Sequence, residues 1–95
     1  MAKGHIMYEA ETAIGLFVVA HKWGTRRALP ADICDFADHL LRKLHPHAEH
    51  NVIDNERTSY TDRSQAIFDS FYDEIISALE KAGFTFNDNS QEWVC

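Results

Sequence analysis

The most regular apolar pattern in the chain lies in residues 66–82, AIFDSFYDEIISALEKA. Bulky apolar side chains recur there at steps of three and four residues, the spacing that gathers side chains on one face of an α-helix. Ser59 or Thr61 can cap the start of this helix through a side-chain oxygen, and Gly83 suits the left-handed residue that often follows a helix end. We therefore predict a helix over residues 61–82.

The second apolar pattern follows Pro30, a residue type favoured in the first turn of a helix. It ends before Pro46, which disfavours helical backbone at the residue ahead of it. Between these prolines the apolar residues again fall on one stripe: Ile33, Phe36, Ala37, Leu40, Leu41 and Leu44. This pattern predicts a helix over residues 31–44.

The first apolar segment, residues 8–23, admits two interpretations. Its middle, residues 14–20, is a continuous apolar run with β-branched side chains, which fits a buried strand as well as a helix. Gly15 would cost a helix about 1 kcal/mol relative to alanine. We predict a helix over residues 8–23, because helix-forming residues lead into the run and Gly24 offers a stop. A strand over residues 14–20 is the alternative.

The C-terminal tail contains two short stretches with aromatic residues, 84–86 and 92–94, on either side of turn-forming residues 87–90. This tail fits a small hairpin or an extended segment. The fold that we predict is therefore all-α: a single domain over residues 1–95, with three helices and a short extended tail. In the α+β alternative, residues 14–20 and the tail pair in a small sheet.

The size and charge of the chain narrow its expected partners. A chain of 95 residues with 45% apolar residues can bury one modest core. Its net charge of -6 is unevenly spread, since residues 1–50 hold six acidic and six Lys or Arg side chains, whereas residues 51–95 hold nine acidic against three basic. Direct nucleic-acid binding needs a positive patch and is therefore disfavoured, whereas docking onto a basic protein surface is favoured.

The two cysteines, Cys34 and Cys95, are far from the dense pattern of a secreted disulfide scaffold. We therefore expect a cytoplasmic protein, with Cys34 as a small buried apolar side chain of the second helix. The longest apolar run, residues 13–20, is shorter than the ~20 residues of a membrane-spanning helix. No membrane partner is expected.

Motifs that carry common chemistry are missing from the sequence. The chain lacks the glycine-rich, cysteine-pair and nucleophile signatures of the usual nucleotide-binding, zinc-finger, calcium-binding and hydrolase classes. Cys34 beside Asp35 is explained by packing without a catalytic role. We expect a protein that is not an enzyme and that has no cofactor.

A histidine cluster offers one alternative. His45, His47 and His50 fall within six residues, together with Glu49. Imidazole and carboxylate groups are ligands of Zn²⁺ and Ni²⁺. The spacing matches no helical metal motif, because Pro46 breaks the geometry. We expect a solvated loop without metal, and a metal site at the three histidines is the alternative.

A basic cluster offers another alternative, because Trp23, Arg26 and Arg27 follow the first predicted helix. An indole beside guanidinium groups could stack on a base or clamp a phosphate, which would make this cluster a small-ligand site. The same cations could instead complement the negative end of the helix dipole.

The charge and the missing motifs together favour a small acidic modulator that binds a larger protein with a basic surface, in the manner of an inhibitor or immunity protein. A mobile-element product acting on a host nuclease or defence complex is one form of this function. Leftover aromatic residues near the joints and tail also allow a homodimer, although the tail could instead cap the core. The expected partner-binding residues are four acids of the third helix and one tail aromatic: Asp69, Asp73, Glu74, Glu80 and Trp93.

Overall fold

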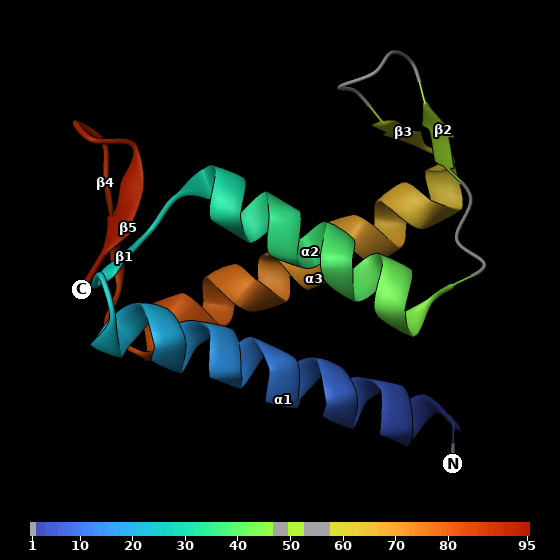
Figure 1. Cartoon of the computed structure of the whole chain (residues 1–95), viewed down its shortest axis with the longest axis horizontal. Coiled ribbons are helices and arrows are strands. Elements are labelled where there is room, and N and C mark those ends of the chain that lie inside the picture. Colours follow the sequence, from blue (N-terminus) through green and yellow to red (C-terminus); the bar gives the residue numbers. More distant parts are fainter. Residues whose placement is uncertain (1, 47–49, 53–57) are drawn as a thin grey trace.

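The computed structural model describes the backbone of residues 2–46, 50–52 and 58–95, and the side chains of residues 8–46 and 61–95. Three helices form the body of the molecule (Figure 1): α1 (Ala2–Trp23), α2 (Pro30–Leu44) and α3 (Asp62–Lys81). Helix α3 packs against both α1 and α2, which contact each other less. All three predicted helices are confirmed, and α1 begins six residues earlier than predicted.

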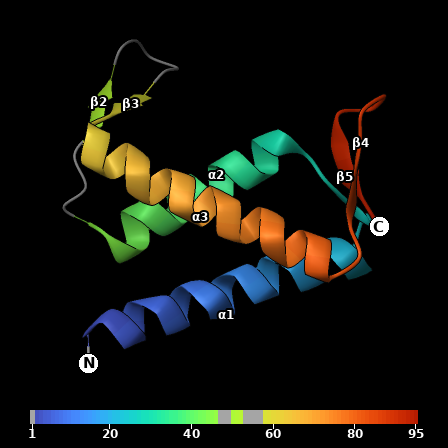
Figure 2. The ribbon, with the colours of Figure 1, turned by 180° about the vertical axis from the view of Figure 1, so that it is seen from behind.

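Five short strands accompany the helices: β1 (Arg27–Ala28), β2 (His50–Val52), β3 (Thr58–Tyr60), β4 (Thr85–Asn87) and β5 (Glu92–Val94). Strands β2 and β3 pair with each other, and β1, β5 and β4 form a separate antiparallel sheet in that order. Figure 2 shows this three-stranded sheet beside the ends of α1 and α3.

The ends of α3 follow from local hydrogen bonding. Of the two residues that could cap its start, Thr61 is the cap, since its Oγ1 accepts a hydrogen bond from the amide of Ser64 at 3.3 Å. At the other end, Gly83 has a φ of 102°, a left-handed conformation that glycine adopts at little cost. The amide of Phe84 then donates to the carbonyl of Leu79 at 3.0 Å, which closes the last turn.

Residues 14–20 are helical, so the strand considered for them does not form. One side of this run is buried, at Ile14 and Val18, whereas Leu16 and Val19 are exposed. A strand buried on both faces would hide all four side chains. The run is continuous because it serves two opposite faces of one helix.

The tail forms a small sheet, as the α+β alternative expected, but its outer partner is β1 in place of residues 14–20. Strand β5 pairs with β1 through Ala28 and Trp93, and with β4 through Phe86 and Trp93. Arg26, with a φ of 62°, turns the chain after α1 and accepts a hydrogen bond from the amide of Cys95 at 3.0 Å. This turn brings β1 beside the end of the chain.

The core lies between the three helices and is closed at one end by the sheet. Phe84 is 2% exposed, and Trp93 packs against the core from β5. Within the described residues, none of the helices combines the length and apolar character required to cross a membrane. The buried apolar residues of the core cluster are Ala10, Ile14, Val18, Ala28, Ile33, Ala37, Leu40, Phe71, Ile75, Leu79 and Phe84.

Candidate protein-binding groove

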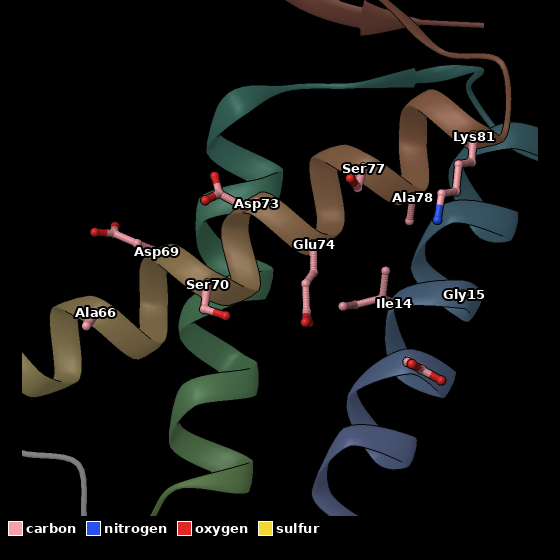
Figure 3. Close-up of a pocket in the computed structure, with 11 residues that line it drawn as sticks. Ile14, Gly15, Ala66, Asp69, Ser70, Asp73, Glu74, Ser77, Ala78 and Lys81 are labelled. Carbon is pink, nitrogen blue, oxygen red and sulfur yellow. The ribbon is translucent and has the colours of Figure 1, made fainter. Parts of the chain in front are cut away.

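A groove of about 810 Å³ runs between α1 and α3 (Figure 3). Among the described residues that line it are four carboxylates, Glu11 from α1 and Asp69, Asp73 and Glu74 from α3, and one amine, Lys81. The groove therefore has a strong excess of negative charge. Its other lining side chains are small or apolar: Ile14, Gly15, Ala66, Ser70, Ser77 and Ala78.

The helical period explains why these acids gather beside the core. Phe71, Ile75 and Leu79 of α3 are buried, which fixes the rotation of the helix. Positions of α3 that are turned away from these three residues then face the solvent, and some of them border α1. Asp73 and Glu74 are consequently exposed beside the core.

The two walls of the groove meet without filling the space between them. In Figure 3 the side chain of Glu74 points from α3 toward α1, and Ile14 points from α1 toward α3. Lys81 extends toward α1 at one end of the groove. The side-chain amide of Gln65 donates a hydrogen bond to Asp69 Oδ1 at 2.9 Å, which orients that carboxylate.

A second groove of about 430 Å³ continues the first toward the start of α3. The two grooves share four lining residues: Glu11, Ala66, Ser70 and Glu74. His45 enters the second groove from the end of α2, with its ring centroid 5.9 Å from that of Phe71. Helices α1 and α3 and the residue that follows α2 therefore contribute to one extended acidic depression.

The depression combines exposed charge with an apolar floor. Exposed carboxylates over an apolar floor can hold ammonium or guanidinium groups together with their aliphatic stems. In the part of the chain whose side chains are described, no three His, Cys, Asp or Glu residues are grouped closely enough to hold a metal ion.

Of the predicted partner-binding residues, Asp69, Asp73 and Glu74 line the first groove. Glu80 is exposed and lies seven residues after Asp73, two helical turns along the same side of α3. It extends the acidic surface beyond the groove lining.

Trp93 has a different place in the molecule. It is half-buried on β5, packs against the core and meets the ring of Phe86 edge-on at a centroid distance of 5.3 Å. It does not line either part of the acidic depression. Its position fits the capping role that the sequence also allowed for the tail.

Two cations at the end of α1 and after it, Lys22 and Arg27, make contacts within the fold. Lys22 Nζ donates to the carbonyl of Ala82 at 3.0 Å, at the negative end of α3, and lies 5.7 Å from the Trp23 ring centroid. Arg27 Nη1 is 3.8 Å from Glu92 Oε1 across the sheet. Trp23 itself is exposed. Ligand binding by Trp23, Arg26 and Arg27 stays a prediction.

The histidine cluster lies partly outside the described residues. His45 ends α2 and donates its amide hydrogen to the carbonyl of Leu41 at 2.8 Å. The side chains of His47 and His50 are outside the described part of the chain. The metal alternative therefore stays a prediction.

Cys34 was expected to be buried, and this prediction is wrong because the residue is exposed. The neighbouring Ile33 is fully buried and turns Cys34 toward the solvent-facing side of α2. Partial burial of the thiol, followed by the carboxylates of Asp35 and Asp38, raises the pKa of Cys34. Burial and the nearby Cys34 likewise raise the pKa of Tyr72.

Sequence reasoning missed two features of this surface. Glu11 joins the acids of α3 only through the packing of α1 against α3, which no local pattern encodes. An exposed apolar face of α1 was also missed, although Tyr8, Leu16, Val19 and Trp23 already stood at helical spacing.

Comparisons of the chain with protein-family models, with curated proteins and with solved structures find no match.

Proposed function

We propose that this protein is a non-catalytic modulator that docks its acidic groove onto a basic segment of a larger protein. One observation carries the proposal: Glu11 of α1 converges with Asp69, Asp73 and Glu74 of α3 around a groove with an apolar floor. Carboxylates at the rim meet the charged ends of Lys and Arg, while their stems and neighbouring apolar side chains contact the floor.

An acidic groove of this kind gives the modulator a physical route to inhibition. Surfaces that bind DNA or RNA are basic, because they neutralise phosphate charges. A protein that presents several carboxylates can occupy such a surface and compete with the nucleic acid. An inhibitor or immunity protein acting on a nuclease, including a mobile-element product acting on a host defence complex, is the form of this function that we favour.

We place this function in the cytoplasm. Cys34 and Cys95 are both free thiols, the state that a reducing compartment maintains. The redox state of the two cysteines tests this placement. If intact protein isolated from its native host carried both cysteines in disulfides, the cytoplasmic placement would be wrong.

The docking proposal is tested by reversing charge inside and outside the groove. The Asp73→Lys/Glu74→Lys variant changes two groove residues, and the control Asp35→Lys/Asp88→Lys changes two exposed acids elsewhere by the same net charge. We expect capture of a basic host protein by the wild type and the control at low salt, and at least about a tenfold loss of affinity in the groove variant.

The dependence of binding on salt provides a second readout. Affinity of the wild type should fall as salt is raised, because the contacts are exposed ion pairs, and the groove variant should lose most of that dependence. Equal binding by the groove variant, with an unchanged salt dependence, would show that the partner docks elsewhere.

A further inference from the structure

Helix α1 has two apolar faces, and the fold uses one of them. Ala10, Ile14 and Val18 face the core. On the opposite side an outer stripe remains in solvent, with exposed fractions of 69% for Tyr8, 67% for Leu16, 52% for Val19 and 77% for Trp23. Gly15 and Thr12 complete the stripe. A contiguous exposed apolar stripe of this kind is typical of an interaction surface.

We propose that the outer stripe of α1 is a homodimer interface, in which two copies of α1 pack antiparallel about a two-fold axis that passes between Gly15 and Leu16. Figures 1 and 2 both show α1 at the edge of the molecule, with α2 and α3 on its other side. A second copy can therefore approach without meeting the other helices first.

The order of side chains along the stripe supports this register. In an antiparallel pair about that axis, each residue of one copy faces a residue of the other copy. The two facing residues are equally far in sequence from the axis, on opposite sides of it. The largest side chains then meet at the two ends, and the smallest residue lies opposite a leucine at the centre. The facing pairs are Tyr8 with Trp23, Thr12 with Val19, and Gly15 with Leu16.

Glycine at the crossing point has a structural use. A Cβ built on Gly15 would meet nothing within 4 Å in one copy, so the fold of the single chain does not require glycine there. Glycine is costly inside a helix. In the dimer it leaves room for Leu16 of the second copy and lets the two backbones come close.

The charges on α1 are complementary in the same arrangement. Glu11 lies near the start of the helix and Lys22 near its end, on the same flank of the stripe. Antiparallel packing brings Glu11 of one copy, which also borders the acidic groove, toward Lys22 of the other, whose ammonium group donates to the carbonyl of Ala82 within its own chain. In a parallel pair the two copies of Glu11 would lie at the same height but on opposite flanks of the interface, so neither would have Lys22 of the other copy beside it.

The aromatic residues at the two ends of the stripe, Tyr8 and Trp23, have a groove against which they can pack in the dimer. A groove of about 290 Å³ between α1 and α2 borders the stripe, and its lining includes Tyr8, Thr12, Leu40 and Leu44. The proposed register places Trp23 of the second copy at this end. Four aromatic side chains bury roughly 600–1,000 Å² in all when they are fully covered, and 69% of Tyr8 and 77% of Trp23 are still exposed in one copy. The area left to bury is a substantial share of the roughly 1,200–2,000 Å² of a stable interface.

The first experiment measures molecular mass by light scattering and sedimentation over a range of concentrations. We expect a dimer for the wild type and a monomer for Leu16→Gln/Val19→Gln, which keeps charge and helix propensity. Leu29→Ser is the matched control, because Leu29 is 46% exposed outside the stripe. It should remain dimeric. A monomeric wild type at about 100 μM would overturn the proposal, since useful homodimers form well below that concentration.

Gly15→Gln separates folding from association. Glutamine is a better helix former than glycine and has open space in one copy, so the dilute monomer should gain thermal stability. At the crossing it should raise the dimer dissociation constant by at least about tenfold, since overpacking a close contact is unfavourable. An unchanged dissociation constant would refute the contact between Gly15 and Leu16.

Cross-linking tests the direction and register. In a Cys34→Ser/Cys95→Ser background, Thr12→Cys/Val19→Cys should form a disulfide-linked dimer on mild oxidation. Thr12→Cys alone should not, because the two copies of residue 12 lie about 10 Å apart along the helices. Efficient cross-linking by Thr12→Cys alone would indicate parallel packing and overturn the proposed interface.

The dimer proposal and the docking proposal can fail separately. Asp73 and Glu74, which are altered to test docking, lie on α3 and outside the stripe. A stripe variant that is monomeric yet binds a basic partner would leave the docking proposal intact.

Discussion

At the scale of single residues, Cys34 shows how the place of a side chain on a helix sets its reactivity. The thiol is exposed on α2, beside Asp35 and one turn from Asp38. Partial burial is the larger cause that raises its pKa, and the two carboxylates add to it. A raised pKa leaves less thiolate at neutral pH, so an accessible cysteine is slow to react.

Substitution of Asp35 should therefore make Cys34 more reactive. In a Cys95→Ser background, Asp35→Asn removes a negative charge next to the thiol and lowers its pKa toward the ordinary value. Alkylation at pH 8 should become faster, by less than about tenfold because burial remains, and the pH–rate curve should move to lower pH. Asp88→Asn, far along the chain, is the control. Identical curves for both variants would exclude a contribution from Asp35.

The acids of the groove show what a local pattern can and cannot predict. Asp69 and Asp73 were expected on the solvent side of α3, because the spacing of its apolar residues fixes the rotation of the helix. Glu11 could not be assigned to the same site, because its approach to α3 depends on how two helices pack. Cys34 was misplaced for a different reason: it is not part of the apolar stripe of α2, and its burial was expected from its residue type and its apolar neighbour Ile33.

At the scale of elements, the helices were predictable and the sheet was only partly so. Each helix has an apolar period that persists over several turns, and α1 was ambiguous because both of its faces are apolar. Strand β1 has two residues, too few to show any period. Its pairing with β5 follows from the turn at Arg26 and the burial of Ala28, which arise only in the folded chain.

The hairpin of β4 and β5 should contribute to stability through Trp93. Trp93→Ala removes a half-buried ring that packs on the core, so the free energy of unfolding should fall by about 2 kcal/mol in chemical denaturation. Phe86→Ala, in the more exposed ring of the same pair, should cost less. A Trp93→Ala variant as stable as the wild type would mean that the sheet does not cap the core.

At the scale of the whole molecule, the acidic groove and the outer stripe lie on adjoining sides of α1 and share Gly15. The acidic depression lies along the seam of α1 and α3, while the outer stripe of α1 faces away from the core. Composition indicated an acidic C-terminal half, but it could not show that an acid from the N-terminal half completes the groove. That convergence depends on α3 lying between α1 and α2.

The same arrangement predicts an order of folding. Helices α2 and α3 follow each other in the chain and contact each other more extensively than α1 and α3 do. The contact between α1 and α3 joins residues that are farther apart in sequence, because all of α2 lies between them. Measured at a concentration at which the chain is monomeric, Ile14→Val in α1 should speed unfolding, by about fivefold for each 1 kcal/mol lost, and leave the folding rate nearly unchanged. Ile33→Val in α2 should slow folding instead. Equal effects of both variants on the folding rate would contradict this order.

Because a chain is synthesised from its N-terminus onward, the core-facing apolar side of α1 cannot be buried against α3 until α3 has been made. Helix α1 leaves the ribosome before α3 has been synthesised, so both of its apolar faces are in water during that interval. A nascent segment with this character is the kind of surface that chaperones hold. We therefore expect α1 to be a chaperone substrate while the following sixty or so residues are translated, which takes a few seconds at roughly 5–20 residues per second.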